Sequence, residues 1–245
     1  MRAVILAAGK GTRLRPLTYG IPKPLLPVGG VPVIDYVIQN IAKCDDIDEV
    51  IVGITGNDRI MAECIDRYLS HQEYPFPVST VETYQRETAG DLEHIINVKK
   101  LKGTIVVAYG DIVSPIPVDK LVAQHHLNVN NYGITSTVCL FKVPKDEAKR
   151  FGIAKLNGIY IDEFVEKPDN PFGSLANAGV YVIEVESVKP MFRDEVVKME
   201  DSIFPELCKN RELAGFESNI QFWYDIGTMD SYLKANDGVS KIIAP

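Results

Sequence analysis

The segment LAAGKGTRLRPLT, residues 6–18, concentrates residue types that bind phosphate. Gly9 and Gly11 allow backbone angles that a side chain would forbid, so successive N–H groups can turn toward one anion. Arg13 and Arg15 add planar charged groups that suit phosphate oxygens. The segment therefore predicts a loop that holds a polyphosphate. Taken alone, such a pattern is also typical of a glycine turn with solvated basic residues.

Two better-known phosphate loops are excluded by spacing. A Walker A loop has a glycine, four residues and then Gly-Lys-Ser/Thr, whereas Gly9-Lys10 is followed by Gly11 and no glycine lies five positions before Gly9. A dinucleotide fingerprint has a small residue three positions after its second glycine, where this chain has Leu14. The loop must therefore be of another kind.

Three further charged residues have positions that suit phosphate and metal chemistry. Lys23 lies between two prolines, which hold its backbone stiff. Asp111 follows the apolar run VVAYG, and Asp225 lies in FWYDIGT, again after an apolar strand. Two carboxylates at strand ends can share one Mg²⁺ ion with phosphate oxygens. Each aspartate alone is more often a turn or capping residue, and spacing does not show whether the fold brings them together.

A polar set in the second half could hold a ligand rich in hydroxyl groups. Glu166 and Lys167 end one expected strand, and Asn177 opens another. Taken singly, these are ordinary surface residues. The four histidines show no metal-ligand spacing, and no Ser-His-Asp or Cys-His arrangement is apparent.

The elements that position these residues follow from the hydrophobic pattern. The first half alternates, with strands expected at 3–6, 50–54, 78–81 and 105–109 and helices at 32–43, after a cap at Asn57, and at 88–98. Residues 22–27 are rich in proline, which predicts an ordered extended loop. In the second half, strands are expected at 134–143, 153–156, 160–165 and 180–183, and helices at 202–208 and 229–239. Alternating strands and helices predict an open, largely parallel α/β sheet.

Composition narrows the class of protein. The 245 residues carry a net charge of −7, which argues against general binding to nucleic acid or to an anionic membrane. The four cysteines lack metal spacing and lie in apolar settings, which predicts buried free thiols in a reducing cytosol. No signal peptide or membrane-spanning segment is evident, so we expect a cytoplasmic protein.

Seven motifs then occur in a characteristic order: LAAGKGTRLRPLT, KPLLPV, AYGD, FGIAKL, FVEKP, NAGVYV and WYDIGTMDSYLKAN. Together they resemble the sugar-1-phosphate nucleotidyltransferases, or nucleoside-diphosphate-sugar pyrophosphorylases, over nearly the whole chain. The resemblance implies a three-layer, Rossmann-like α/β fold with a mostly parallel central sheet and a mixed, β-rich second half. It also implies one domain over 1–245, with a nucleotide-binding half at 1–130 and a sugar-binding half at 131–245 on the same sheet.

The resemblance implies that a nucleoside triphosphate and a sugar 1-phosphate, of the glucose or mannose type, give a nucleotide sugar and pyrophosphate. It implies Mg²⁺ held at the positions of Asp111 and Asp225, with Lys23 approaching the α-phosphate. The implied triphosphate and nucleotide contacts are Gly11, Thr12 and Arg13 together with Leu6, Ala8, Gly9, Glu82 and Thr88. The implied sugar contacts are Gly152, Glu166 and Asn177, and Lys167 is implied to bind the sugar phosphate. In-line attack on the α-phosphorus needs positioning and charge neutralisation rather than a covalent nucleophile, in agreement with the absence of a nucleophile–base pair.

The match is loosest where the base would bind. Family members usually have an acid or amide followed by Leu-Gly-Thr-Ala, whereas this chain reads ETYQRETAG, with Glu87 where glycine is usual. A carboxylate at Glu82 only accepts hydrogen bonds and would suit the N1–H and N2 edge of guanine. If Gln85 takes this role, uracil or thymine fits instead. The base therefore stays open.

Two other functions remain as alternatives. A catalytically inactive, nucleotide-sugar-binding regulatory subunit is disfavoured because Arg13, Lys23 and both aspartates are present. A cytidylyltransferase for a non-sugar phosphate is disfavoured by the matches to sugar-contacting positions. Members that also transfer acyl groups carry a C-terminal hexapeptide-repeat domain, and since this chain ends at Pro245 we expect no second activity. By analogy alone, a homo-oligomer is also open.

Overall fold

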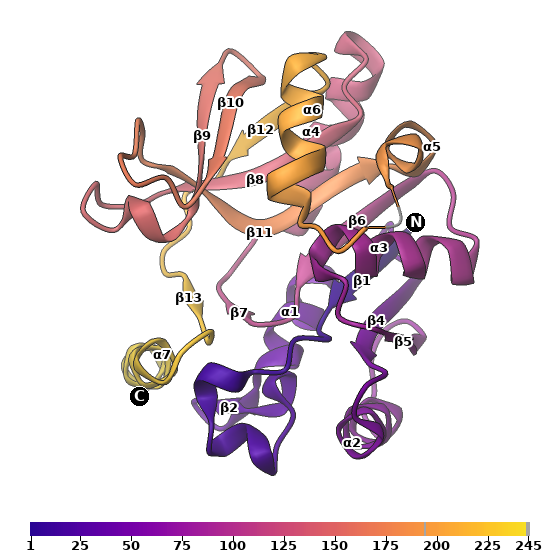
Figure 1. Cartoon of the computed structure of the whole chain (residues 1–245), viewed down its shortest axis with the longest axis vertical. Helices are drawn as coiled ribbons and strands as arrows, with labels where there is room; N and C mark the ends of the chain where they lie inside the picture. The colour runs from indigo at the N-terminus through magenta and orange to yellow at the C-terminus, as the bar shows by residue number, and fades with distance from the viewer. Residues whose placement is uncertain (194, 244–245) are drawn as a thin grey trace.

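The computed structural model describes residues 1–193 and 195–243, and its centre is a nine-stranded sheet of order β5-β4-β1-β6-β11-β8-β12-β10-β9 (Figure 1). Its strands are β1 (Arg2–Leu6), β4 (Glu49–Thr55), β5 (Val78–Thr83), β6 (Thr104–Tyr109), β8 (Ser136–Lys142), β9 (Gly152–Asn157), β10 (Tyr160–Glu166), β11 (Leu175–Glu184) and β12 (Leu213–Glu217). Two short ribbons are separate from it, β2 (Pro27–Val28) with β3 (Val31–Pro32) and β7 (Ile112–Val113) with β13 (Tyr224–Asp225). The helices are α1 (Val33–Ile41), α2 (Arg59–Ser70), α3 (Glu87–Lys99), α4 (Val118–Tyr132), α5 (Val185–Val188), α6 (Phe204–Lys209) and α7 (Met229–Ile243).

The two halves of the chain pair their strands differently within this one sheet. β5, β4, β1 and β6 are all parallel, as alternating strands and helices predict. Beyond β6 the sheet is mostly antiparallel: β11 runs against β6, β8 and β9, and β10 runs against β9 and β12, while β8 and β12 are parallel. The mostly parallel character therefore belongs to the first half, and the second half is the mixed, β-rich part.

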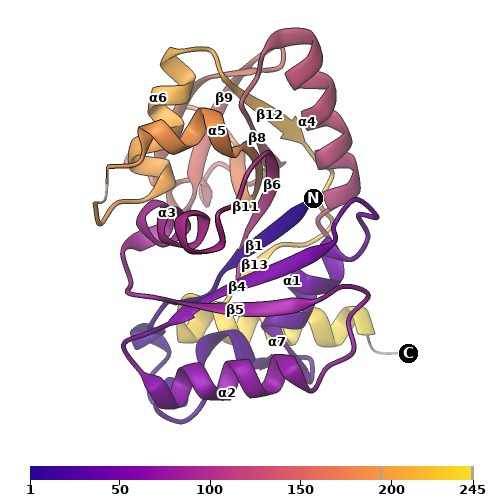
Figure 2. The ribbon, with the colours of Figure 1, turned by 90° about the vertical axis from the view of Figure 1, so that its right-hand side faces the viewer.

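Helices cover both faces of the sheet and give three layers. Apolar residues of α1, α2 and α4 pack on one face in a core cluster that includes Ile5, Val52 and Val106. Those of α3, α5 and α6 pack on the other face against Val4 and Val107. Figure 2 shows α3, α5 and α6 on the side of the sheet opposite α4. Alternate side chains of the central strands are thus buried on both faces, which explains their continuous apolar runs.

The end of the described chain returns to its beginning. A third core cluster joins Leu14 and Leu26 of the N-terminal loop to Val113 of β7, to Ile226, which directly follows β13, and to Ala235 of α7. Helix α7 lies beside β2 at the foot of the molecule (Figure 1). This cluster attaches the basic N-terminal loop to the segment that carries Asp225.

Several expectations need correction. Asp58 rather than Asn57 caps α2, because the Asp58 carboxylate accepts a hydrogen bond from the Met61 N–H at 3.2 Å. The proline-rich segment is not simply extended, because it contains a 3₁₀ turn, Lys23–Leu25. Pro24 fits this turn because the proline ring fixes φ near the value that a 3₁₀ helix needs. All four thiols are free, but only Cys44 and Cys139 are buried; Cys64 lies exposed on α2 and Cys208 is half-buried.

Helix α4 and strand β12 are among the elements that the sequence analysis did not predict. Helix α4 has a weak apolar pattern because His125 and Asn128 are among its buried residues. Strand β12 is short and contains Gly215, where a Cβ would lie only 2.4 Å from the Leu156 side chain. No helix among the described residues is long and apolar enough to cross a bilayer. The expected domain end at Pro245 falls outside the described residues.

Candidate active site

Two adjoining cavities lie beyond the carboxyl ends of β1 and β6, and Tyr109 and Asp111 line both of them. Cavity A, of about 600 Å³, is otherwise lined mostly by residues of the second half of the chain. Cavity B, of about 440 Å³, is lined by residues of the first half. Ligands of open α/β sheets bind at this edge, so the position agrees with the one expected for Asp111.

The fold brings Asp111 and Asp225 together although they lie far apart in the sequence. Asp111 immediately precedes β7, and in the ribbon Asp225 of β13 pairs with Ile112. The backbone N–H of Ile226 also donates to the carbonyl oxygen of Asp111 at 3.1 Å. Both aspartates line cavity A. The pairing of the short strands β7 and β13 therefore brings the two aspartates together, which sequence spacing could not show.

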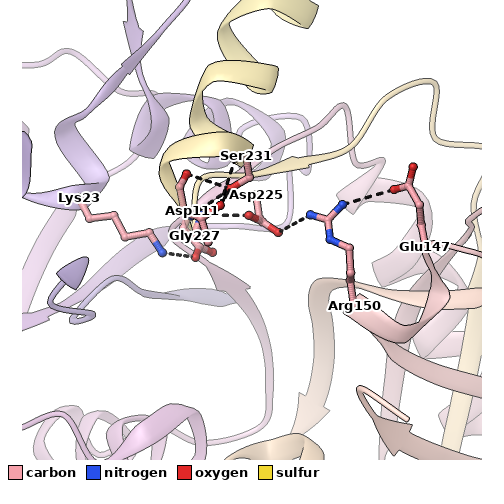
Figure 3. Close-up of polar contacts among 8 residues, drawn as sticks. Lys23, Asp111, Glu147, Arg150, Asp225, Gly227 and Ser231 are labelled. Carbon is pink, nitrogen blue, oxygen red and sulfur yellow. Dashed lines mark hydrogen bonds and ion pairs between the residues drawn. The ribbon is translucent and has the colours of Figure 1, made fainter. Parts of the chain in front are cut away.

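Basic side chains surround this pair (Figure 3). The Lys23 ammonium contacts the Asp111 carboxylate. Arg150 Nη2 lies 3.7 Å from Asp225 Oδ2, and its Nη1 lies 3.4 Å from Glu147. Arg13 Nη2 would lie 3.5 Å from a Cβ placed on Gly227, which brings it beside the same turn. Three cations from separate segments thus converge on two carboxylates.

The donor set at this point fits a hard divalent cation bound together with substrate. Mg²⁺ in phosphoryl-transfer sites commonly takes one or two carboxylates and completes its shell with water and phosphate oxygens. No group of three potential metal-binding side chains occurs among the described residues. Asp111 and Asp225 would therefore hold the ion only in combination with phosphate oxygens of a substrate.

The basic N-terminal loop turns at Gly11, which adopts the left-handed backbone conformation. Gly11 has φ of 61°, and a Cβ there would lie 2.9 Å from Thr18 Cγ2. Its carbonyl oxygen accepts a hydrogen bond from the Thr18 hydroxyl at 2.8 Å, and the 3₁₀ turn Thr12–Leu14 follows. Gly9 does not take a positive φ, which corrects the expectation for the pair; a Cβ on Gly9 would meet nothing within 4 Å. Gly9 thus leaves space rather than making a turn.

The structure divides the expected nucleotide contacts into three groups. Those that line cavity B are Leu6, Ala8, Gly9, Lys23 and Thr88. Gly11 and Thr12 line neither cavity, and Arg13 lines cavity A instead. Glu82 is exposed on β5 and lines neither cavity. Gln85 and Glu87 line cavity B in its place.

The turn that carries these last two residues is strained. Gln85 and Glu87 have φ of 59° and 61°, values that non-glycine residues rarely adopt. Gln85 Nε2 donates to Thr55 Oγ1 at 3.1 Å, and Asp91 Oδ1 accepts from the Arg86 N–H at 2.9 Å. Burial raises the pKa of Asp91. Glu87 therefore adopts a backbone conformation that glycine takes up more readily.

All four expected sugar contacts line cavity A: Gly152, Glu166, Lys167 and Asn177. Lys167 Nζ forms an ion pair of 2.8 Å with Glu166 Oε1. A Cβ on Gly152 would lie 2.8 Å from Glu166 Oε2, so glycine permits this close approach. Asn177 Oδ1 accepts a hydrogen bond from the Gly179 N–H at 2.8 Å, at an irregularity in β11.

Other residues of cavity A were not identified from the sequence. Arg150 directly precedes the motif FGIAKL, which gave no reason to include it. Trp223 stacks on Phe141 at 5.3 Å between ring centroids and donates to the Ala178 carbonyl oxygen at 3.1 Å. Its place in FWYDIGT was a usable signal. Glu200, which is only 5% exposed, lies in a segment with no recognisable motif.

Comparison with known proteins agrees with this geometry. The family model described as nucleotidyl transferase matches residues 2–242. The chain belongs to the nucleotidyl transferase family. The resemblance of the seven ordered motifs to the sugar-1-phosphate nucleotidyltransferases is thereby confirmed at the level of family.

Individual relatives have related names. The mannose-1-phosphate guanyltransferase of Saccharomyces cerevisiae is 31% identical over 240 residues, covering 95% of this chain and 63% of the relative. The bifunctional protein GlmU of Methanococcus aeolicus is 34% identical over 251 residues, covering 99% of this chain and 55% of the relative. The chain thus spans roughly three fifths of the length of these two relatives. A crystal structure of a candidate glucose-1-phosphate thymidylyltransferase from Bacillus anthracis, in complex with a sucrose, has a TM-score of 0.82 at 26% identity, covering 97% of this chain and 94% of that one.

Proposed function

We propose that this chain transfers a nucleoside monophosphate from a nucleoside triphosphate to a sugar 1-phosphate, releasing pyrophosphate. The observation that carries the proposal is the junction of the two cavities, where Asp111 and Asp225 meet three converging cations. At this junction, a phosphate group bound in one cavity would lie next to a phosphate group bound in the other. Family membership and the relatives' names support the same reaction.

Cavity B takes the triphosphate, and cavity A takes the sugar phosphate. On this assignment residues 1–130 supply the nucleotide side and residues 131–245 supply most of the sugar side of one domain. The backbone from Leu6 to Lys10 lies along the phosphates, with open space above Gly9. Glu166 and Asn177 face the sugar, and Lys167 neutralises its phosphate.

In the reaction, an oxygen of the sugar phosphate attacks the α-phosphorus and pyrophosphate leaves from the opposite side. Lys23 and Arg13 stabilise the charge that develops on the α-phosphate oxygens and on the leaving group. Asp111 and Asp225 hold Mg²⁺, which supplies Lewis-acid neutralisation of the phosphates when bound. Lys23 would move from Asp111 to the phosphate as the ligands bind, since the two compete for the same ammonium.

The experiment is a pyrophosphate-release assay with GTP, UTP, dTTP and CTP, each paired with glucose 1-phosphate and mannose 1-phosphate. The relatives' names make mannose 1-phosphate with GTP and glucose 1-phosphate with dTTP the first pairs to try. We expect release with at least one pair, dependent on Mg²⁺ and lost in Asp111→Asn. No turnover with any pair, in protein that is folded, would contradict the proposal.

A further inference from the structure

Glu200 is a buried carboxylate at the wall between the two cavities. It lies in the π-helical turn Met199–Ile203 that leads into α6, and although only 5% exposed it lines cavity A. π-helical turns are rare in proteins, and those that occur are often found at functional sites. Burying a carboxylate costs free energy because it loses hydration. A ligand in the cavity that donates a hydrogen bond to Glu200 would recover part of this free energy.

Among the described residues, two hydroxyl groups donate hydrogen bonds to the Glu200 carboxylate. The Tyr109 hydroxyl donates to Oε1, and the Thr88 hydroxyl donates to Oε2 at 3.1 Å. Within the described part of the chain, no lysine, arginine or histidine forms an ion pair with Glu200. Burial raises the pKa of Glu200, and the hydrogen bond from Tyr109 opposes this effect. A carboxylate accepts about four hydrogen bonds, so acceptor capacity remains for a ligand.

These contacts connect the two sides of the site. Tyr109 lines both cavities, and Thr88 lines cavity B. Thr88 Oγ1 also accepts from the Met199 N–H at 2.9 Å, which joins the start of α3 to the turn that carries Glu200. Figure 2 shows α3 and α6 on the same side of the sheet. Glu200 therefore accepts a hydrogen bond from Thr88, which lines cavity B, while Glu200 itself lines cavity A.

Cavity A thus presents two glutamates of different character. Glu166 is neutralised by Lys167, whereas the side chains that donate to Glu200 in the described part of the chain are the neutral hydroxyls of Tyr109 and Thr88. An anionic group of the ligand would be repelled from Glu200, but a neutral hydroxyl can donate to it. We propose that Glu200 is a specificity-determining residue that accepts a hydrogen bond from one sugar hydroxyl. This inference rests on the proposed function, because it assumes that a sugar phosphate occupies cavity A.

The test is a cycle of variants and substrates, using the pair of substrates that wild-type protein accepts best. Wild type and Glu200→Gln are assayed with the parent sugar 1-phosphate and with its deoxy analogues, one hydroxyl removed at a time. Asp201→Asn is the matched control, since Asp201 is exposed in the same turn and lines neither cavity. Glu200→Asp, which withdraws the carboxylate by one methylene, serves as a second variant if the glutamine variant fails to fold.

We expect Glu200→Gln to raise KM for the sugar 1-phosphate about tenfold and to leave KM for the triphosphate within about twofold. For one deoxy analogue, kcat/KM of wild type should be about tenfold lower than with the parent sugar 1-phosphate. The kcat/KM of the variant should be nearly the same with this analogue as with the parent. Asp201→Asn should behave as wild type.

The inference is overturned if the folded variant keeps its sugar KM, if both KM values rise together, or if every deoxy analogue costs the two proteins equally. A wild-type protein without turnover on any pair overturns the proposed function, and the inference with it. An active wild type with an unaffected Glu200 variant overturns the inference alone.

Discussion

The two sides of the candidate site are built in different ways. Cavity B is formed by loops that follow the parallel strands β1 and β6, where chain segments leave the sheet at one edge. Cavity A is formed by residues at the ends and irregularities of the antiparallel strands β9, β10 and β11 and by a π-helical turn. Tyr109 and Asp111 line both cavities, and the ribbon of β7 and β13 brings Asp225 beside Asp111. The comparison suggests that the chemistry depends on this junction and that each side separately sets one substrate.

The largest effect is expected where the two sides meet. Asp111→Asn and Asp225→Asn should each lower kcat by about a thousandfold or more, because each would remove a ligand of the proposed cation that neutralises both phosphates. Pyrophosphate release at saturating substrate measures this, with Asp45→Asn, an exposed position away from the cavities, as the control. Substantial activity in either aspartate variant would mean that the junction is not the reaction centre.

A smaller but still large effect is expected from the cations. Arg13→Ala and Lys23→Ala should lower kcat about a hundredfold, since each loses a charge that acts on the phosphates in the transition state. Their free energy of unfolding should change by only about 1 kcal/mol, because Arg13 is exposed and the partly buried Lys23–Asp111 pair opens onto a cavity, where solvent screens it. Parallel kinetic and urea-unfolding measurements separate the two quantities. Comparable losses of activity and stability would show that these residues act on the fold instead.

A side-specific effect is expected from Lys167. Its side chain is 57% exposed and paired with Glu166, so Lys167→Ala should leave stability unchanged and raise KM for the sugar 1-phosphate about tenfold. KM for the triphosphate should not move. Lys155→Ala, an exposed lysine of β9 that lines neither cavity, is the control. An equal rise in both KM values would remove the distinction between the two sides.

The smallest effect concerns the strained turn of cavity B. Glu87→Gly should raise the free energy of unfolding by about 1 kcal/mol, because glycine adopts a positive φ without the steric cost that glutamate has there. Thermal or urea unfolding measures this, and Glu93→Gly in the interior of α3 should be destabilising by comparison. The ranking of the four triphosphates may be measured on the same variant, and a changed ranking would indicate that Glu87 contacts the base.

The sequence predicted the parallel half of the fold well, because its strands are continuous apolar runs between helices of regular period. It predicted Asp111 and Asp225 as strand-end carboxylates, but their meeting depends on two-residue strands that pair over a long separation in the chain. Such pairing leaves no local signal. The motifs also located the four expected residues of cavity A.

Other features had no usable local pattern. Glu82 was assigned by its place in a motif, whereas the direction of a side chain at a strand end depends on where the strand turns. Glu200 lies in a π-helical turn, which has neither the period of a helix nor that of a strand. Helix α4 was missed because its buried face carries the polar residues His125 and Asn128. His125 Nδ1 lies 2.9 Å from Thr137 Oγ1, and Asn128 Oδ1 accepts a hydrogen bond from Gln124 Nε2 at 2.9 Å.

The most direct test of the account measures ligand-induced thermal shifts on three proteins. Wild type, Lys23→Ala and Lys167→Ala are each melted with the triphosphate alone and with the sugar 1-phosphate alone, since a ligand that binds the native state raises Tm by mass action. The account predicts that Lys23→Ala loses most of the shift from the triphosphate and keeps that from the sugar phosphate, and that Lys167→Ala does the reverse. If either variant lost both shifts, or if both ligands stabilised all three proteins equally, the division of the site into two cavities that each hold one substrate would be wrong.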